Sequence, residues 1–131
     1  MNELKYIYID GDNIGLLIEK SFLDNNEKRI KEINRTVKEV VMEITKYLTI
    51  KDHEIIFSGA DGIISKGINL DAISLMRYIR GLNNDITFSV GIGENLNNSY
   101  VALRYAKSNN KNTAVELKDN TFTILEKNNA T

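Results

Sequence analysis

The sequence predicts an α/β (α+β) fold of the ferredoxin-like class, in which helices cover a central, mostly antiparallel sheet. Three observations lead to this prediction. Apolar residues alternate with period two in short runs, they recur at three- and four-residue steps in longer ones, and an Asp-Gly pair joins two apolar runs near the middle. The resulting order is β-α-α-β-β-α-β-α-β(-β). A central hairpin flanked by βα units breaks the strict alternation of a doubly wound parallel sheet and is typical of ferredoxin-like sandwiches.

Length and composition indicate one domain and exclude several kinds of chemistry. The 131 residues include 17 basic and 18 acidic side chains, no cysteine and one histidine. This balanced charge argues against polymeric nucleic acid as a partner, because such binding depends on many lysine and arginine contacts to phosphate. The lack of cysteine excludes thiolate catalysis and zinc–thiolate sites. We expect one domain over residues 1–131, with a frayed polar tail at residues 126–131.

No apolar run in the sequence approaches the ~18 residues that a membrane span needs. The start of the chain also lacks the charged-then-apolar layout of a signal peptide. We therefore expect a soluble, cytoplasmic protein without a membrane partner.

The first part of the chain is predicted to form a strand and two helices. Residues 6–9 are a β-rich run that ends at Asp10, and a turn at residues 11–13 leads into a helix over residues 14–18. The following segment carries apolar residues three or four positions apart, which predicts a long amphipathic helix. Its apolar stripe consists of Ile30, Ile33, Val37, Val40, Val41, Ile44 and Leu48.

The middle of the chain is predicted to form a hairpin and a helix. Two apolar runs, residues 54–58 and 63–65, are joined by a turn at residues 59–62 that contains Asp-Gly. Residues 70–82 then show helical spacing of apolar side chains, and Gly81 fits a stop near the end of that helix.

The last part of the chain is predicted to form a strand, a helix and a closing pair of strands. Residues 86–92 alternate with period two, as in a half-buried strand. Asn98 can cap a helix that carries apolar residues on one side. Residues 114–117 and 122–124 are apolar and β-branched enough to pair as strands.

Two aspartates stand at strand ends that this fold brings together. Asp10 follows the first strand and Asp61 lies in the turn of the hairpin. Two carboxylates ~4 Å apart repel by about 4 kcal/mol at an effective dielectric near 20, so a bound cation or a shared proton would stabilise them. Oxygen ligands without cysteine or histidine favour Mg²⁺ or Mn²⁺, and Gly11 and Gly59 would let backbone approach a phosphate. The alternative is ordinary turn chemistry, in which aspartate beside glycine or asparagine is common.

Other polar residues near these strand ends have both a structural and a functional interpretation. Asp12 and Asn13 can form the turn or cap the following helix. Lys107 and Lys111 lie four residues apart near a helix C-terminus, where the helix dipole favours cations, and the same pair could hold a triphosphate. We assign no chemistry to His53.

Three stretches, in the same order, resemble a known family. Residues 8–15 resemble the D-x-D strand end of GGDEF-type nucleotide cyclases, and more closely the D-G-D-N of the palm domains in type III CRISPR effectors. Residues 57–62 stand where those families carry a GGDEF or GGDD hairpin. Residues 89–93 and 102–112 resemble the cyclases' S-x-G-(I/V) strand and A-x-x-x-A-K-x-x-G-(R/K)-N helix end. The short chain looks like the minimal CRISPR polymerase (mCpol) family over roughly residues 4–117.

The resemblance implies a palm fold that condenses nucleoside triphosphates, with ATP the expected substrate, into a cyclic di- or oligonucleotide second messenger for anti-phage defence. By position, Asp10 and Asp61 become catalytic metal ligands for Mg²⁺ or Mn²⁺, with the Gly11 carbonyl as a third. Nucleotide-binding roles fall on Asn13, Ile14, Gly15, Gly59, Ala60, Lys107 and Lys111. The resemblance also implies a homodimer, at least transiently, and a downstream effector that senses the product.

The sequence departs from the family pattern at the hairpin. Ala60 replaces the second glycine, and Gly62 replaces the second acidic residue of GGDD or GGDEF. Asp12 is a candidate for the missing charge at the metal. Asn109 or Asn110 stands near the family's glycine, and asparagine tolerates left-handed backbone. The change at Gly62 bears on turnover more than on binding, so a catalytically inactive nucleotide-binding palm is one alternative.

Two other enzyme classes share parts of these motifs. Residues 9–13 also resemble the I-D-G-x-N strand end of NYN/PIN-like metal-dependent ribonucleases, and residues 58–61 partly match their later S-G-D-x-D. Those nucleases use a parallel Rossmann-like sheet, whereas the middle of this chain is predicted to be a hairpin. Haloacid dehalogenase-type phosphatases also begin with D-x-D after a strand, but Ile14 only approximates the Thr or Val that they carry.

Overall fold

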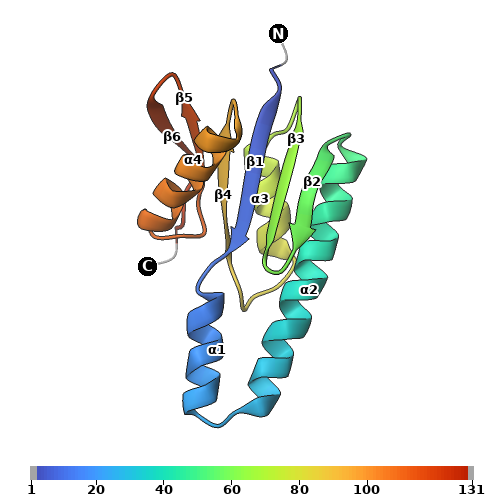
Figure 1. Ribbon diagram of the computed structural model, residues 1–131, viewed down its shortest axis with the longest axis vertical. Coiled ribbons are helices and arrows are strands. Elements are labelled where there is room, and N and C mark those ends of the chain that lie inside the picture. Colours follow the sequence, from blue (N-terminus) through green and yellow to red (C-terminus); the bar gives the residue numbers. More distant parts are fainter. Residues whose placement is uncertain (1–2, 130–131) are drawn as a thin grey trace.

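The computed structural model describes residues 3–129, in which it contains six strands and four helices (Figure 1). The strands are β1 (Lys5–Gly11), β2 (Glu54–Gly59), β3 (Gly62–Gly67), β4 (Phe88–Gly93), β5 (Ala114–Lys118) and β6 (Thr121–Glu126). The helices are α1 (Ile14–Leu23), α2 (Glu27–Ile50), α3 (Ala72–Gly81) and α4 (Leu96–Ser108). The predicted order of elements is confirmed.

The strands form one sheet in the order β2-β3-β1-β4-β5-β6. β1 lies inside this sheet, antiparallel to β3 on one side and to β4 on the other. The pairing of β4 with β5 is parallel, and the other pairings are antiparallel. The predicted ferredoxin-like, mostly antiparallel sheet is therefore confirmed, and its topology sets the end of β1 beside the turn between β2 and β3.

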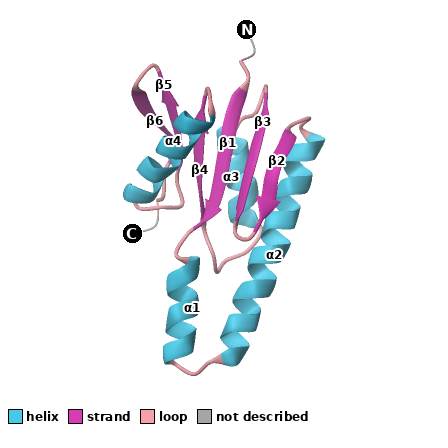
Figure 2. Cartoon of the chain, in the orientation of Figure 1, coloured by secondary structure: helices cyan, strands magenta, loops and turns pink. Residues whose placement is uncertain are grey.

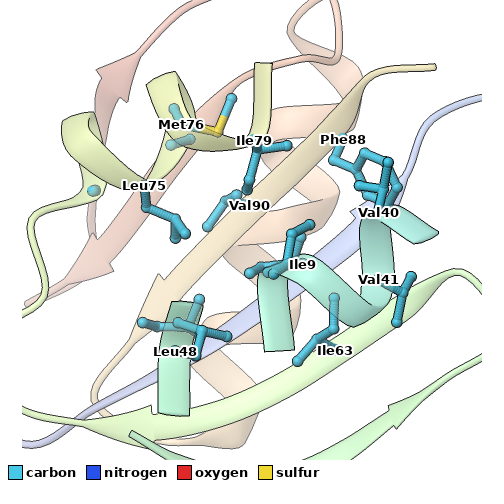
Figure 3. Close-up of a cluster of buried hydrophobic side chains, with 14 of the residues drawn as sticks. Ile9, Val40, Val41, Leu48, Ile63, Leu75, Met76, Ile79, Phe88 and Val90 are labelled. Carbon is cyan, nitrogen blue, oxygen red and sulfur yellow. The ribbon is translucent and has the colours of Figure 1, made fainter. Parts of the chain in front are cut away.

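The main core lies between the sheet and the two helices α2 and α3, which cover the same face (Figure 2). Alternation along β1 directs Ile7 and Ile9 into this core, while Tyr6, Tyr8 and Asp10 point to the opposite face. Figure 3 shows sheet residues meeting helix residues, among them Val40, Val41, Leu48, Leu75, Met76 and Ile79. Each fully buried aliphatic side chain contributes roughly 1.5–3 kcal/mol, so this layer supplies most of the stability.

α2 is the long amphipathic helix that the apolar stripe predicts. Asn26 caps it by accepting a hydrogen bond from the backbone N–H of Arg29. Its buried residues are Ile33, Val37, Val40, Val41, Ile44 and Leu48. Within residues 3–129, neither α2 nor any other helix combines the length and the apolar character that a membrane span requires.

α4 covers the other face of the sheet, over β4 and β5. There the backbone of the helix lies in close contact with the backbone of β4 at two glycines. A Cβ atom added to Gly91 would lie 2.2 Å from the carbonyl oxygen of Ser99, and one added to Gly93 would lie 2.5 Å from the Cβ of Asn98. Ala102 and Ala106 of α4 are fully buried in the same contact. The small residues of β4 therefore let α4 lie directly on the strand, which fixes where the end of that helix falls.

Several element boundaries differ from the predicted ones, and three of these differences have a hydrogen-bonded cause. α3 begins at Ala72 rather than at residue 70, because the carboxylate of Asp71 accepts hydrogen bonds from the first turn. α4 is capped by Asn95 rather than Asn98, whose own backbone N–H donates to the Asn95 side chain at 2.8 Å. β4 begins at Phe88, because the preceding residues turn around Asn83, whose side-chain Oδ1 accepts hydrogen bonds from the backbone N–H groups of Asp85 and Ile86.

The predicted frayed tail falls partly outside the described residues, which end at residue 129. Within them, Glu126 is the last residue of β6 and its carboxylate accepts a hydrogen bond from Arg80 at 3.0 Å. Arg80 also donates to the backbone carbonyl of Lys127 at 2.9 Å. These contacts connect the start of the tail to α3.

Substituting Gly91→Ala should destabilise the fold strongly, because the new methyl group would overlap the backbone of α4. We expect a loss on the order of 3 kcal/mol in the free energy of unfolding, measured by urea titration. Gly81→Ala is the matched control, since a Cβ at Gly81 meets nothing within 4 Å. Equal stability of the two variants would contradict the packing described for α4.

Candidate functional site

The end of β1, the turn of the β2–β3 hairpin and the start of α1 meet at one end of the sheet (Figure 1). Asp10 is directly opposite Gly62 in the β1–β3 ladder. The backbone N–H of Gly11 donates to the carbonyl of Asp61 at 2.9 Å, and a Cβ on Gly11 would lie 3.5 Å from the Cβ of Asp61. The structure thus brings Asp10 and Asp61, distant in sequence, to the same place.

The turn that presents Asp61 is tight and partly left-handed. Gly59 pairs with Gly62, which leaves two residues, Ala60 and Asp61, to close the hairpin. Ala60 has a φ of 50°, a conformation that costs a residue with a Cβ roughly 1–2 kcal/mol and that glycine adopts freely. The hairpin therefore keeps its shape with alanine at this position.

Lys107, in the last turn of α4, places its ammonium group among three oxygen ligands. The Nζ atom lies 2.8 Å from the carbonyl oxygen of Gly11, 3.1 Å from the carboxylate of Asp10 and 3.1 Å from that of Asp12. This side chain is 21% exposed. The Gly11 carbonyl and the Asp10 carboxylate are two of the groups expected to ligate a metal. In this structure the positive charge beside both of them is the ammonium group of Lys107.

Asp12 is almost completely buried, at 3% exposure, and both of its carboxylate oxygens are occupied. Oδ1 accepts hydrogen bonds from Ser89 at 2.7 Å and from Lys107 at 3.1 Å. Oδ2 accepts from Thr87 at 2.7 Å and from the backbone N–H of Asn112 at 2.9 Å. With four donors around it, this carboxylate connects β1, β4, α4 and the loop before β5.

The N-terminus of α1 has no side-chain cap. Asn13 occupies the N-cap position in a left-handed conformation, with φ 59° and ψ 21°, and its side chain contacts the ammonium of Lys111 instead of the helix. Ile14 packs against Gly11, where an added Cβ would lie 2.9 Å from its Cγ1. At Gly15 an added Cβ would meet nothing within 4 Å. The amides of this first turn are therefore available to an anion, which helix N-termini attract.

Burial controls the ionisation of the groups at this end of the sheet. It raises the pKa of Asp10, and the neighbouring carboxylates of Asp61 and Asp12 raise it further, while Lys107 lowers it in part. Burial also raises the pKa of Tyr8, and the charges of Asp10 and Asp61 add to that rise. A carboxylate that is poorly stabilised by its own protein is well suited to bind an added cation.

The donor set fits a hard divalent cation. Asp10, Asp61 and the Gly11 carbonyl offer only oxygen, and the ammonium of Lys107 already contacts two of these three groups. No cluster of three or more histidine, cysteine or acidic side chains arranged to hold a metal occurs among residues 3–129. Two carboxylates that leave room for water and phosphate oxygens are typical of Mg²⁺ sites at nucleotides, so the residues fit Mg²⁺ or Mn²⁺.

Several residues of this site carried no signal strong enough for sequence analysis to find their role. Thr87 holds Asp12 through its hydroxyl and Asn112 through its backbone N–H. A loop threonine is too common to indicate such a role, and a backbone donor leaves no signal in the residue type. Ser89 lies fully buried in a strand of apolar residues, which is a usable signal for a buried polar partner. Tyr8 and Phe57 look like ordinary strand residues in the sequence, but both rings lie beside glycines at the turn of the hairpin, Gly62 and Gly59 respectively.

Asp10 and Asp12 should respond in opposite ways to the same isosteric change. Asp12→Asn should lower the free energy of unfolding by roughly 3 kcal/mol. Whichever way the new amide is turned, its NH₂ group would replace an oxygen that now accepts two hydrogen bonds, from Ser89 and Lys107 or from Thr87 and the Asn112 backbone. Asp10→Asn should leave stability unchanged or raise it, because a raised pKa means that the folded state disfavours the ionised carboxyl at neutral pH. Urea unfolding at pH 7 with a chelator present measures both. A loss for Asp10→Asn as large as that for Asp12→Asn would show that Asp10 is structural.

Comparison with solved structures identifies the fold. The active GGEEF domain of a diguanylate cyclase from Vibrio cholerae superposes with a TM-score of 0.65 at 18% identity, covering 88% of this chain and 83% of that one. The adenylyl cyclase CyaB from P. aeruginosa superposes with a TM-score of 0.63 at 9% identity, covering 91% and 78%. At these identities the likeness shows the palm fold of nucleotide cyclases and no more.

Comparison at the level of sequence identifies the family. No curated protein matches the chain. The sequence model of the mCpol family, described as the minimal CRISPR polymerase domain, matches residues 6–117, which include Asp10, Asp61, Lys107 and Lys111. The predicted resemblance is therefore confirmed over most of the chain, and this protein belongs to the minimal CRISPR polymerase (mCpol) family.

Proposed function

We propose that this protein is a nucleotidyltransferase that condenses nucleoside triphosphates, with ATP the expected substrate, into a cyclic di- or oligonucleotide. A ribose hydroxyl of one nucleotide gives up its proton and attacks the α-phosphorus of another. A new phosphodiester bond forms, the bond from the α-phosphorus to the oxygen that bridges to the β-phosphorus breaks, and pyrophosphate leaves. A further step of the same kind closes the ring and releases another pyrophosphate. The observation that carries the proposal is the meeting of Asp10, Asp61 and the Gly11 carbonyl beside an uncapped helix N-terminus and two lysines. Negative groups for a cation and positive groups for a triphosphate thus lie side by side.

Asp10, Asp61 and the Gly11 carbonyl would hold Mg²⁺ or Mn²⁺. When bound, such a cation lowers the pKa of an attacking hydroxyl and offsets the charge that develops on the leaving group. Lys107 contacts two of these groups, the Asp10 carboxylate and the Gly11 carbonyl. Asp12 has no free oxygen in this arrangement, so we assign it the positioning of Lys107 and not the fourth ligand that sequence analysis considered.

The triphosphate would lie against the start of α1. Asn13, Ile14 and Gly15 supply backbone amides there, and the helix dipole adds a partial positive charge. Lys111 reaches this position already, through its contact with the Asn13 side chain. Gly59 and Ala60 offer backbone without bulky side chains on the neighbouring hairpin, where a nucleotide can approach closely.

Gly62, where related hairpins carry a second acidic residue, favours one alternative function. A Cβ at this position would lie 3.2 Å from a carboxylate oxygen of Asp10 and 3.2 Å from the Ile9 carbonyl, so an acidic side chain would crowd Asp10 as it now stands. Gly62 itself supplies no carboxylate, so the alternative is a palm that binds nucleotides without turning them over.

The ribonuclease alternative loses its support, because β1 pairs antiparallel with both neighbours and the nuclease sheet is parallel.

Joining two nucleotides requires two bound substrates. We therefore propose that the protein works as a homodimer, at least transiently, and that its product is a second messenger sensed by a downstream effector in anti-phage defence. Family membership supports this proposal.

Incubation of the purified protein with each radiolabelled nucleoside triphosphate and Mg²⁺ or Mn²⁺ should yield a phosphatase-resistant cyclic product, resolved by chromatography. The product should disappear in Asp10→Ala and in Asp61→Ala, because each variant removes one of two carboxylates available to the metal. Metal-dependent nucleotide binding without any product would support the inactive palm. Cleavage of single-stranded RNA that is lost in Asp10→Ala would overturn the proposal.

Gly15→Ala should separate stability from binding at the start of α1. Alanine stabilises a helix by up to about 1 kcal/mol relative to glycine, and the space around Gly15 accepts a methyl group. The same methyl should hinder phosphates at the first-turn amides and weaken binding of a non-hydrolysable ATP analogue by about tenfold, a change of ~1.4 kcal/mol. Isothermal titration and urea unfolding measure the two effects. Gly81→Ala is the control, and unchanged nucleotide affinity in Gly15→Ala would place the phosphates elsewhere.

A further inference from the structure

The sheet face that carries Asp10 has an apolar, aromatic row directly beside the carboxylates. In the strand registers, Gly59, Gly62 and Asp10 form one transverse row across β2, β3 and β1. The next row consists of Phe57, Ile64 and Tyr8. Because side chains two residues apart on a strand point to the same face, both rows lie on the face opposite the main core.

Both rings of this second row lean toward the glycines of the first. A Cβ placed on Gly59 would lie 3.5 Å from Cζ of Phe57, and a Cβ placed on Gly62 would lie 3.6 Å from Cε1 of Tyr8. The two glycines therefore leave the aromatic row in direct continuity with Asp10 and Asp61. We name the set Phe57, Ile64 and Tyr8 the aromatic row.

This part of the sheet is open. α2 and α3 lie on the opposite face, and α4 lies over β4 and β5 and also contacts β1, so none of the helices within residues 3–129 stands in front of β2 and β3 (Figure 1). Phe57 is 54% exposed although it is a large apolar side chain in a strand. Ser58, the next residue, points the other way and bonds Thr45 of α2 at 2.8 Å, which is consistent with Phe57 lying on the face opposite α2.

The chemistry of the aromatic row suits a flat, uncharged ring system. Two aromatic rings and an aliphatic side chain offer a surface for stacking, which every nucleobase can use because each has a π-face. The proposed reaction needs a second nucleotide whose ribose hydroxyl reaches the carboxylate end, and its base must lie somewhere within one nucleotide's length of Asp10. The aromatic row is the apolar surface that borders Asp10 on the open face.

We infer that the aromatic row binds the base of the nucleotide that supplies the attacking hydroxyl. The inference rests on the proposed function and adds to it a place for the acceptor base. It holds whether that nucleotide enters alone or is carried in by a second copy of the chain. Stacking without hydrogen-bond readout also implies that this subsite tolerates different bases.

The experiment uses the full chain saturated with α,β-methylene-ATP and Mg²⁺, so that the triphosphate position is filled. Adenosine 5′-monophosphate is then titrated as the acceptor surrogate, and ring and methyl signals of Phe57, Tyr8 and Ile64 are followed by NMR. These signals should shift along one saturable curve. Phe57→Ala should weaken the binding of the monophosphate by about tenfold or more, whereas Phe57→Trp should preserve it, because tryptophan still stacks.

Two controls make the result specific. Ribose 5-phosphate, which lacks a base, should not shift the signals. Phe22→Ala removes a ring that is 71% exposed at the end of α1, and it should bind the monophosphate like the wild type. Equal binding by Phe57→Ala and the wild type would overturn the inference and leave the proposed function intact.

Other outcomes separate the inference from the function on which it rests. If the ATP analogue itself fails to bind, or binds Asp10→Ala unchanged, the proposed function fails first. If the signals of the aromatic row move with protein concentration alone, and Phe57→Ala shifts the sedimentation behaviour rather than the monophosphate curve, the row is an interface between copies. That result would also overturn the inference.

Discussion

The buried carboxylate of Asp12 connects the parts of the chain from which the site is built. It accepts hydrogen bonds from Thr87 just before β4 and Ser89 within it, from Lys107 on α4 and from the backbone of Asn112 before β5. Burying a charge is costly unless it is paired and fully hydrogen-bonded. Here both carboxylate oxygens accept hydrogen bonds, and Oδ1 is also paired with the ammonium of Lys107. Because these bonds run between elements distant in sequence, the position of Lys107 relative to β1 depends on them.

Neighbouring carboxylates on one strand end consequently have different tasks. Both oxygens of Asp12 accept hydrogen bonds from the protein. Burial, in contrast, raises the pKa of Asp10, and Lys107 forms an ion pair with that carboxylate. Asp61 faces the same space from the hairpin, whose backbone bonds Gly11. The fold thus leaves Asp10, a carboxylate that would bind a cation, poorly stabilised, whereas it surrounds the structural carboxylate of Asp12 with donors. Such a division is common where a site must accept a ligand.

Glycines shape the two halves of the sheet face in opposite ways. Gly91 and Gly93 allow α4 to lie on β4 at distances that no side chain permits, so that half is closed. Gly59 and Gly62 lie beside Asp10 on β2 and β3, which no helix of the described part of the chain covers on this face, and that half stays open next to the rings of Tyr8 and Phe57. One face therefore contains a rigid support, which positions the lysines, and an accessible surface, on which substrates can lie.

The local pattern of the sequence determined the elements, their order and the sheet class, because period-two and helical apolar spacing report directly which faces are buried. It also indicated Asp10 and Asp61 as partners, since a hairpin beside the first strand leaves little freedom for where its turn lies. The start of α4 was predicted at Asn98 instead of Asn95, because several closely spaced asparagines can each cap a helix. Only the tertiary structure decided that Asp12 is a buried support and that Lys107 points at the carboxylates. Those roles depend on which donors surround a side chain after folding, and contacts between residues so far apart in the chain leave no periodic trace in it.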